Sequence, residues 1–197
     1  WLDIDYMDAY KVFTFSTHRF PAPEQILSRW QAQGVKTVVI VDPGVKRERH
    51  YGVYEAGHAE QLFVRNQRDE ELVGEVWPSP VVWPDFSLPR TRQWWGDLHG
   101  FYTHLGVAGI WNDMNEPAAF RRAGKTLPLD ARQGAGSHGQ MHNLYGLQMA
   151  QATYEGLLRV RPTHRPFVLT RSGAPGIQKY AWVWTGDNAS YWEHLEG

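Results

Sequence analysis

The sequence lacks cysteine altogether, and neither a long apolar run nor a signal peptide is visible in its 197 residues. Disulfide bonds are therefore excluded, a membrane span is not expected, and these absences together favour a cytoplasmic location. The sequence also lacks an excess of basic residues, with 20 Lys and Arg against 21 Asp and Glu. Because a basic excess is what neutralises a phosphate backbone, nucleic acid is not an expected partner.

Aromatic residues, in contrast, are plentiful: the sequence has 10 Trp, 9 Tyr and 8 Phe. Most of these rings are expected to build the hydrophobic core. Flat rings also suit sugar binding, because the C–H face of a pyranose packs well on an indole ring. The composition is therefore compatible with a carbohydrate site without requiring one.

One unit recurs along the chain, in which a helix-like stretch ends near a glycine and a short β-branched run follows it. Complete copies of this unit predict strands at residues 37–41, 107–111 and 166–170. Shorter strand-like runs occupy residues 1–7 and 180–185. Apolar strands that alternate with helices predict an α/β fold, in which a parallel sheet has its helices outside.

Polar residues directly follow each predicted strand, as expected when a site lies at the carboxyl ends of barrel strands. An open doubly wound sheet would place its site in the same way. A (β/α)8 TIM barrel needs eight strands, so we expect this chain, which opens on Trp1 within a strand, to be an excerpt from a longer protein. Residues 1–197 would form one partial catalytic domain, with a hairpin-like insertion at residues 50–89 and a long loop at residues 121–141.

Two carboxylic acids at strand ends fit the chemistry of glycosidic bond cleavage. That reaction uses one carboxylate to attack or stabilise the anomeric carbon and a second carboxyl group to exchange a proton. Asp113 and Asp187 each follow a predicted strand, and tryptophans accompany both, namely Trp111 for the first and Trp182 and Trp184 for the second. An apolar wall raises the pKa of a carboxyl group, but the sequence does not say which aspartate has the raised pKa.

Several motifs resemble glycoside hydrolase family 31, which contains α-glucosidases, α-xylosidases and their relatives. The segment at residues 109–117, GIWNDMNEP, resembles the nucleophile signature of that family. Further similar segments are WLDIDYMD at residues 1–8, VWP at 76–78, WPDF at 83–86, RSG at 171–173, GIQKY at 176–180 and WTGDN at 184–188. The resemblance spans nearly the whole chain in order, and it implies that the chain covers about strands 2–6 of the (β/α)8 barrel.

The resemblance also implies roles for individual residues. Asp113 would be the nucleophile that forms a glycosyl-enzyme, and Asp187 would be the acid/base. Asp3 would bind sugar hydroxyls, and Arg171 would hold a hydroxyl or the nucleophile carboxylate. The substrate pocket would be lined by Ile4, Val45, Trp77, Trp111, Met114 and Trp184. The partner would be an oligosaccharide or α-glycoside substrate, cleaved with retention and without a metal or other cofactor.

Some alternatives stay open at this level. Asn-Glu-Pro at a strand end also occurs in β-glycosidases of another clan, where Glu116 rather than Asp113 would be catalytic. A non-catalytic carbohydrate-binding relative would keep the tryptophans but would not need both aspartates. Asp3, Asp5 and Asp8 could suggest a divalent metal, but no matching His or Glu set lies nearby. The sequence leaves the sugar open between glucose, xylose, galactose and sulfoquinovose, and it does not separate a hydrolase from a lyase.

Overall fold

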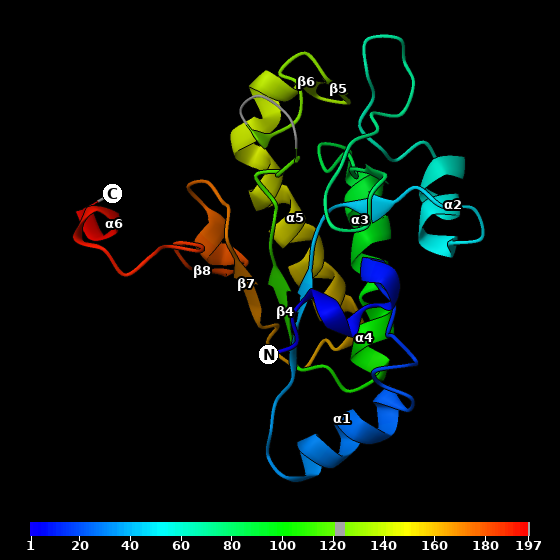
Figure 1. Ribbon diagram of the computed structural model, residues 1–197, viewed down its shortest axis with the longest axis vertical. Coiled ribbons are helices and arrows are strands. Elements are labelled where there is room, and N and C mark those ends of the chain that lie inside the picture. Colours follow the sequence, from blue (N-terminus) through cyan, green and yellow to red (C-terminus); the bar gives the residue numbers. More distant parts are fainter. Residues whose placement is uncertain (121–124, 197) are drawn as a thin grey trace.

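A computed structural model describes residues 1–120 and 125–196, and its centre is a parallel β-sheet (Figure 1). The strands are β1 (Val38–Val41), β4 (Gly109–Asn112), β7 (Val168–Thr170) and β8 (Trp182–Val183), and they lie side by side in that order. Leu2 adds a parallel bridge to Val39 at the β1 edge. Since spatial order equals chain order, the sheet has the arrangement of consecutive strands in a (β/α) barrel. The predicted strands are therefore confirmed, although the one expected at the N-terminus is reduced to a single bridge.

Helices precede the central strands, as the repeating unit predicts. They are α1 (Pro23–Ala32) before β1, α3 (Pro89–Leu98) and α4 (Gly100–His104) before β4, and α5 (His138–Val160) before β7. Proline in the first turn starts both α1 and α3, where its missing N–H costs no hydrogen bond. Gly34 and Gly106 follow α1 and α4 with φ values of 81° and 91°, a left-handed conformation that suits glycine and ends each helix.

The segments between the barrel units contain more structure than the sequence indicates. Residues 50–89 hold the unexpected helix α2 (Gly52–Ala59), and β3 (Val81–Val82) pairs with β2 (Val45–Lys46). The expected hairpin survives as a tight turn closed by an antiparallel bridge between Arg65 and Glu71. The segment after this turn pairs with other residues, because Gly74 forms an antiparallel bridge with Val81.

The loop predicted at residues 121–141 is partly ordered into short elements. Its residues 121–124 lie outside the described residues. The strands β5 (Arg132–Gln133) and β6 (Gly136–Ser137) form a hairpin, and α5 begins directly after it. A capping box explains this early start. The Ser137 side chain accepts a hydrogen bond from the Gln140 backbone amide, and the Gln140 side chain accepts one from the Ser137 backbone amide.

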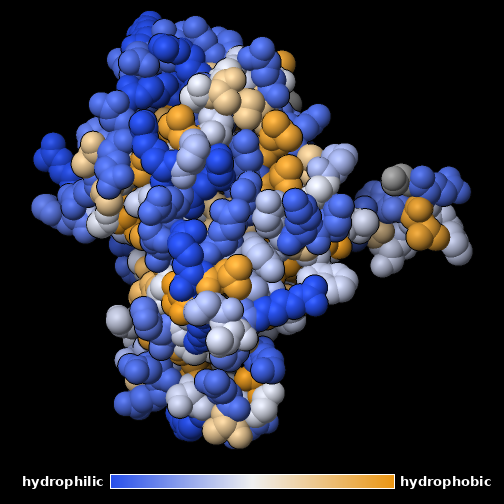
Figure 2. Space-filling model, turned by 180° about the vertical axis from the view of Figure 1, so that it is seen from behind, coloured by the Kyte–Doolittle hydropathy of each residue, from blue (hydrophilic) through white to orange (hydrophobic). Residues whose placement is uncertain are grey.

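The remaining elements are short. They are the 3-10 helices η1 (Ile4–Tyr6), η2 (Asp8–Tyr10) and η4 (Ile177–Lys179), and the C-terminal α6 (Trp192–Glu196). The segment that carries α6 stands away from the body of the molecule in two opposite views (Figures 1 and 2). Trp182 and Val183 on the edge strand β8 are 64% and 54% exposed. An edge strand with exposed apolar side chains is what a barrel piece with neighbouring strands missing would present.

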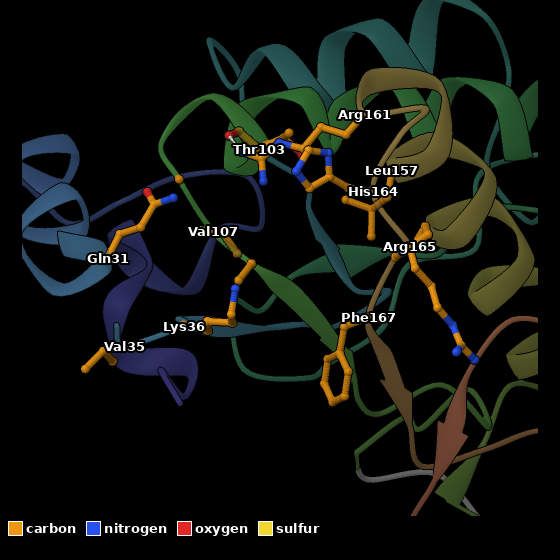
Figure 3. A pocket seen from close by; sticks show the side chains of 13 residues that line it. Gln31, Val35, Lys36, Thr103, Val107, Leu157, Arg161, His164, Arg165 and Phe167 are labelled. Atoms are coloured by element: carbon orange, nitrogen blue, oxygen red, sulfur yellow. Dashed lines mark hydrogen bonds between the residues drawn. The ribbon is translucent and has the colours of Figure 1, made fainter. Parts of the chain in front are cut away.

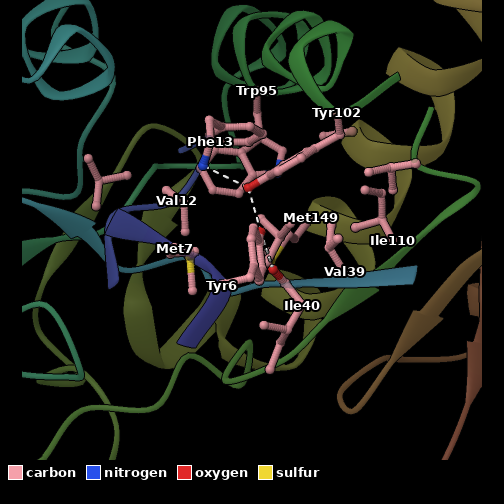
Figure 4. Close-up of a cluster of buried hydrophobic side chains, with 14 of the residues drawn as sticks. Tyr6, Met7, Val12, Phe13, Val39, Ile40, Trp95, Tyr102, Ile110 and Met149 are labelled. Atoms are coloured by element: carbon pink, nitrogen blue, oxygen red, sulfur yellow. Dashed lines mark hydrogen bonds between the residues drawn. The ribbon is translucent and has the colours of Figure 1, made fainter. Parts of the chain in front are cut away.

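The core between the sheet and the helices is rich in aromatic rings. Tyr6, Phe13, Trp95 and Tyr102 are all buried there beside strand residues such as Ile40 (Figure 4). The Tyr6 hydroxyl lies 2.8 Å from the Ile40 carbonyl oxygen and 2.7 Å from the Tyr102 hydroxyl. The Phe13 amide in turn donates to the Tyr102 hydroxyl. Because buried hydroxyls need partners, this chain of hydrogen bonds ties the N-terminal segment to β1 and α4.

None of the helices in the described part of the chain combines the length and the apolarity that crossing a bilayer requires.

Helices α3 and α5 touch at two glycines, and this contact makes a prediction about stability. A Cβ atom built on Gly156 would lie 2.3 Å from the Gly96 carbonyl oxygen and 2.4 Å from the Gly96 Cα. Both neighbours are backbone atoms, so the helices themselves would have to separate. We expect Gly156→Ala to lower the free energy of unfolding by about 3 kcal/mol, at the upper end of ordinary overpacking. Urea denaturation of the full-length protein measures this change.

The matched control is Gly52→Ala at the start of α2, where an added Cβ meets nothing within 4 Å. Alanine is a better helix former than glycine, so this variant should be neutral or more stable by about 0.5–1 kcal/mol. Equal effects of the two substitutions would contradict the proposed contact between α3 and α5.

Candidate active site

Charged residues meet at the carboxyl end of the sheet, one after each central strand. Val41, Asn112 and Thr170 are register partners at the ends of β1, β4 and β7. The next residues are therefore Asp42, Asp113 and Arg171, which lie side by side on neighbouring strand ends. Backbone hydrogen bonds from the Asp113 amide to Val41 O and from the Arg171 amide to Asn112 O extend the ladder this far. Since in-register residues of parallel strands face the same side, the pairing brings these three side chains together.

Arg171 is the centre of this group. Its Nε and Nη2 donate to Glu116 Oε1 and Oε2, each at 2.9 Å. Arg171 Nε also lies 3.2 Å from Asp113 Oδ1, and its Nη1 lies 3.8 Å from Asp187 Oδ2. One guanidinium group thus faces the carboxylates of Asp113, Glu116 and Asp187. A cation in this place reduces the mutual repulsion of the three anions.

Asp113 is buried, with 9% of its surface exposed. This burial raises the pKa of the Asp113 carboxyl, while the Arg171 charge and the Met114 backbone amide act in the opposite direction. Although Arg171 Nε lies close by, Asp113 Oδ1 accepts no hydrogen bond from the described residues. The result is a buried carboxylate oxygen that lies next to a positive charge.

Asp187 lies in a different environment, with 91% of its side chain exposed. The two tryptophans expected to accompany it diverge. Trp184 packs edge-on against Trp111 at 5.6 Å between ring centroids, whereas Trp182 is largely exposed. Of the two aspartates, Asp113 is therefore the buried one and Asp187 the exposed one among the residues described here.

Hydrogen bonds of a buried polar side chain fix the turn that carries Asp113 and Glu116. Asn115 is fully buried, and its Nδ2 donates to Thr170 Oγ1 at 2.8 Å. Its Oδ1 accepts from the Ser172 amide at 3.2 Å. The segments that follow β4 and β7 are therefore joined by hydrogen bonds next to Arg171. Met114 has a φ of 55°, a left-handed conformation that is unusual for a residue other than glycine. Backbone strain of this kind gathers at functional sites, where surrounding contacts hold it.

The predicted pocket residues have the following surroundings in the structure. Met114 Sδ lies 3.2 Å from Arg171 Nη2, and Trp111 packs between Trp184 and Trp1. Asp3 and the half-buried Ile4 lie at the start of η1, where Asp3 Oδ1 accepts from the Ile4 amide.

Val45 is fully buried in the core, and the half-exposed Trp77 packs edge-on against Phe120. The roles of all these residues in a substrate pocket stay predictions.

Sequence reasoning missed two members of the group. Asp42 is buried, burial raises the pKa of its carboxyl group well above the usual value, and the charge of Asp113 adds to this effect. Its position after β1 matches that of Asp113 after β4, and this shared strand-end position was the signal that could have identified it. Glu116 entered only as a rival catalytic acid, whereas the structure pairs it with Arg171.

A separate cavity of about 320 Å³ lies at the opposite, amino end of the strands (Figure 3). Lys36, Val107 and Phe167 line it, and they come shortly before β1, β4 and β7. It therefore belongs to the face of the barrel that lies away from the charged group. Across the described residues, no group of three or more His, Asp or Glu side chains is arranged to hold a metal ion.

Comparison with known proteins places this arrangement in a family. Residues 1–197 match the family described as "Glycosyl hydrolases family 31 TIM-barrel domain". The chain is 46% identical over 200 residues to "Alpha-glucosidase 2" of Bacillus thermoamyloliquefaciens, covering 100% of this chain and 25% of that protein. It is 40% identical to human "Neutral alpha-glucosidase C", covering 100% of this chain and 22% of that protein. The chain thus spans about a quarter of the length of these curated relatives.

Solved structures agree with the sequence comparison. A crystal structure of a glucosidase II alpha subunit superposes with a TM-score of 0.92 at 37% identity, over 99% of this chain and 22% of that one. A family 31 alpha-glucosidase from Bacteroides thetaiotaomicron gives a TM-score of 0.84 at 39% identity, over 100% of this chain and 32% of that one. The chain therefore belongs to glycosyl hydrolase family 31, and it is part of the TIM-barrel domain of that family.

Proposed function

We propose that the full-length protein is a retaining α-glucosidase that removes terminal α-linked glucose from oligosaccharides or other α-glucosides. The observation that carries this proposal is the placement of Asp113 and Asp187 on either side of one guanidinium group at the carboxyl end of the barrel. The relatives named above, which are called alpha-glucosidases and a glucosidase, support glucose as the sugar.

In the first step, an Asp113 oxygen would attack the anomeric carbon of the bound α-glucoside. The bond from that carbon to the glycosidic oxygen breaks, and Asp187 donates a proton to the departing oxygen. The product is a β-linked glycosyl ester on Asp113.

In the second step, a water molecule would attack the same carbon from the opposite side. Asp187, now ionised, accepts a proton from that water, and the ester bond to Asp113 breaks. Two inversions give net retention of the α configuration. Arg171 would stabilise the ionised form of Asp113 before the attack and after the release.

The exposure of Asp187 is consistent with this proposal because the chain spans only part of its relatives. An acid that works near neutral pH needs a less solvated environment than Asp187 has here. We propose that further barrel strands cover the β8 side and supply that environment. The same strands would complete the pocket around the exposed Trp182.

The proposal is tested by treating the full-length protein with a mechanism-based 5-fluoro α-glucosyl fluoride and mapping the labelled peptide by mass spectrometry. We expect a covalent sugar on Asp113 and, with an aryl α-glucoside, α-glucose as the first product seen by NMR. A label on Glu116 would instead make Glu116 the nucleophile and remove Asp113 from that role. Absence of both label and turnover across several α-glycosides would favour a carbohydrate-binding protein.

A further inference from the structure

The contacts of Glu116 give it a part in the site that differs from either catalytic role considered so far. Its carboxylate receives two parallel hydrogen bonds from Arg171, from Nε and from Nη2, both at 2.9 Å. A bidentate pair of this type fixes the plane and direction of a guanidinium group. The Arg171 side chain is 19% exposed and that of Glu116 is 35% exposed, so the pair is partly shielded from water.

The pairing with Glu116 determines how Arg171 interacts with Asp113. Asp113 Oδ1 lies 3.2 Å from the same Nε atom, but the Nε–H points at Glu116 and not at Asp113. The positive charge of Arg171 therefore acts on Asp113, yet Asp113 Oδ1 accepts no hydrogen bond from Arg171. A hydrogen bond to a carboxylate oxygen stabilises the anion and lowers its basicity, and a less basic carboxylate is a weaker nucleophile.

We propose that Glu116 is a positioning residue that turns the Arg171 guanidinium so that it supports Asp113 by charge alone, without a hydrogen bond that would weaken the carboxylate as a nucleophile. The inference rests on the proposed function, because it assigns a task within that reaction. Glu116 itself does not touch the reacting atoms. Its effect passes through Arg171 to the nucleophile.

Substitution of Glu116 by glutamine separates this role from a merely structural one. Glutamine keeps the shape of the side chain, but its amide nitrogen cannot accept from a guanidinium donor and its charge is lost. Arg171 would then keep at most one of its two hydrogen bonds to this side chain, so its guanidinium group could turn and donate to Asp113. Both the new hydrogen bond and the loss of a nearby negative charge lower the pKa of Asp113.

The sign of the pH effect follows from the groups around Asp113. These are Arg171 directly after β7, Asp187 after β8 and Glu116 on its own turn, with Asp42 directly after β1. The nucleophile must be ionised, so activity falls as the pH drops through the pKa of Asp113. In Glu116→Gln that pKa is lower, and the acidic limb of kcat/KM moves to lower pH.

The experiment uses the full-length protein, with Glu116→Gln, Glu116→Asp and the control Asp97→Asn. Asp97 also forms an ion pair with an arginine, Arg159 at 2.8 Å, but on the outer helices. We expect Glu116→Gln to slow labelling by the 5-fluoro glucosyl fluoride about 10²-fold, in line with the cost of a misplaced active-site group. Its acidic limb should shift to lower pH at an unchanged Tm. Glu116→Asp keeps the charge but retracts it by one methylene, so its labelling rate should be intermediate, and Asp97→Asn should behave as wild type.

The inference is overturned if Glu116→Gln labels at the wild-type rate, or if its loss of rate comes with an unmoved acidic limb. If glutamine prevents folding, Glu116→Asp decides the matter, because a wild-type rate and pH profile in that variant are equally contrary. Wild-type protein labelled on Asp113 leaves the proposed function intact even when the Glu116 variants contradict this inference. Wild-type protein labelled on Glu116 overturns both.

Discussion

Replacing Asp113 by alanine in the full-length protein is expected to reduce kcat for an aryl α-glucoside on the order of 10⁵-fold, comparable with nucleophile removal in other covalent enzymes. The reason is that no other described carboxylate can form the ester. Glu116 is engaged by Arg171 in two hydrogen bonds, and Asp187 is needed as the proton donor. Steady-state kinetics at a saturating substrate concentration measure the loss.

Sodium azide gives this variant a stereochemical test. Alanine leaves a space where the carboxylate was, and azide entering that space would attack the anomeric carbon directly. Because this is a single inversion, the product should be a β-glucosyl azide, which NMR identifies by its anomeric coupling. Formation of the α-azide would mean that a covalent intermediate still forms and that Asp113 is not the nucleophile. Asp97→Asn, on the outer face, should keep wild-type turnover.

Replacing Asp187 by alanine should have a large effect that depends on the leaving group. With maltose or an alkyl α-glucoside the departing oxygen needs a proton, and we expect kcat/KM to fall about 10³-fold. With a dinitrophenyl α-glucoside the leaving group is stable as an anion, so the first step should stay fast. The second step then lacks its general base, and a burst of dinitrophenol should precede slow turnover.

Azide distinguishes this variant from the first one. The glycosyl-enzyme on Asp113 still forms, and azide attacks it from the opposite side without needing a base. The product should therefore be the α-glucosyl azide, the result of two inversions. A uniform loss of activity on all leaving groups, without an azide product, would remove Asp187 from the acid/base role.

Local sequence features were sufficient to predict the fold class and to identify Asp113 and Asp187 as candidate catalytic residues. The recurrence of helix, glycine and β-branched strand depends on periodicities of about 3.6 and 2, which neighbouring residues determine by themselves. Prolines at the start of α1 and α3 and glycines after α1 and α4 mark element ends through their own backbone preferences. Helix α2 was missed because it has only eight residues, Gly52–Ala59, and two of them are glycines, which are poor helix formers.

The sequence by itself therefore determined a parallel α/β domain with acids at its strand ends, together with the two aspartates proposed for catalysis. Only the tertiary structure decided which charged groups meet. Strand register places Asp42 beside Asp113, and the left-handed turn at Met114 carries Glu116 to Arg171. Burial then separates Asp113 from the exposed Asp187. The physical reason is that register, side-chain direction and desolvation arise from contacts between residues far apart in the chain, which no local pattern encodes.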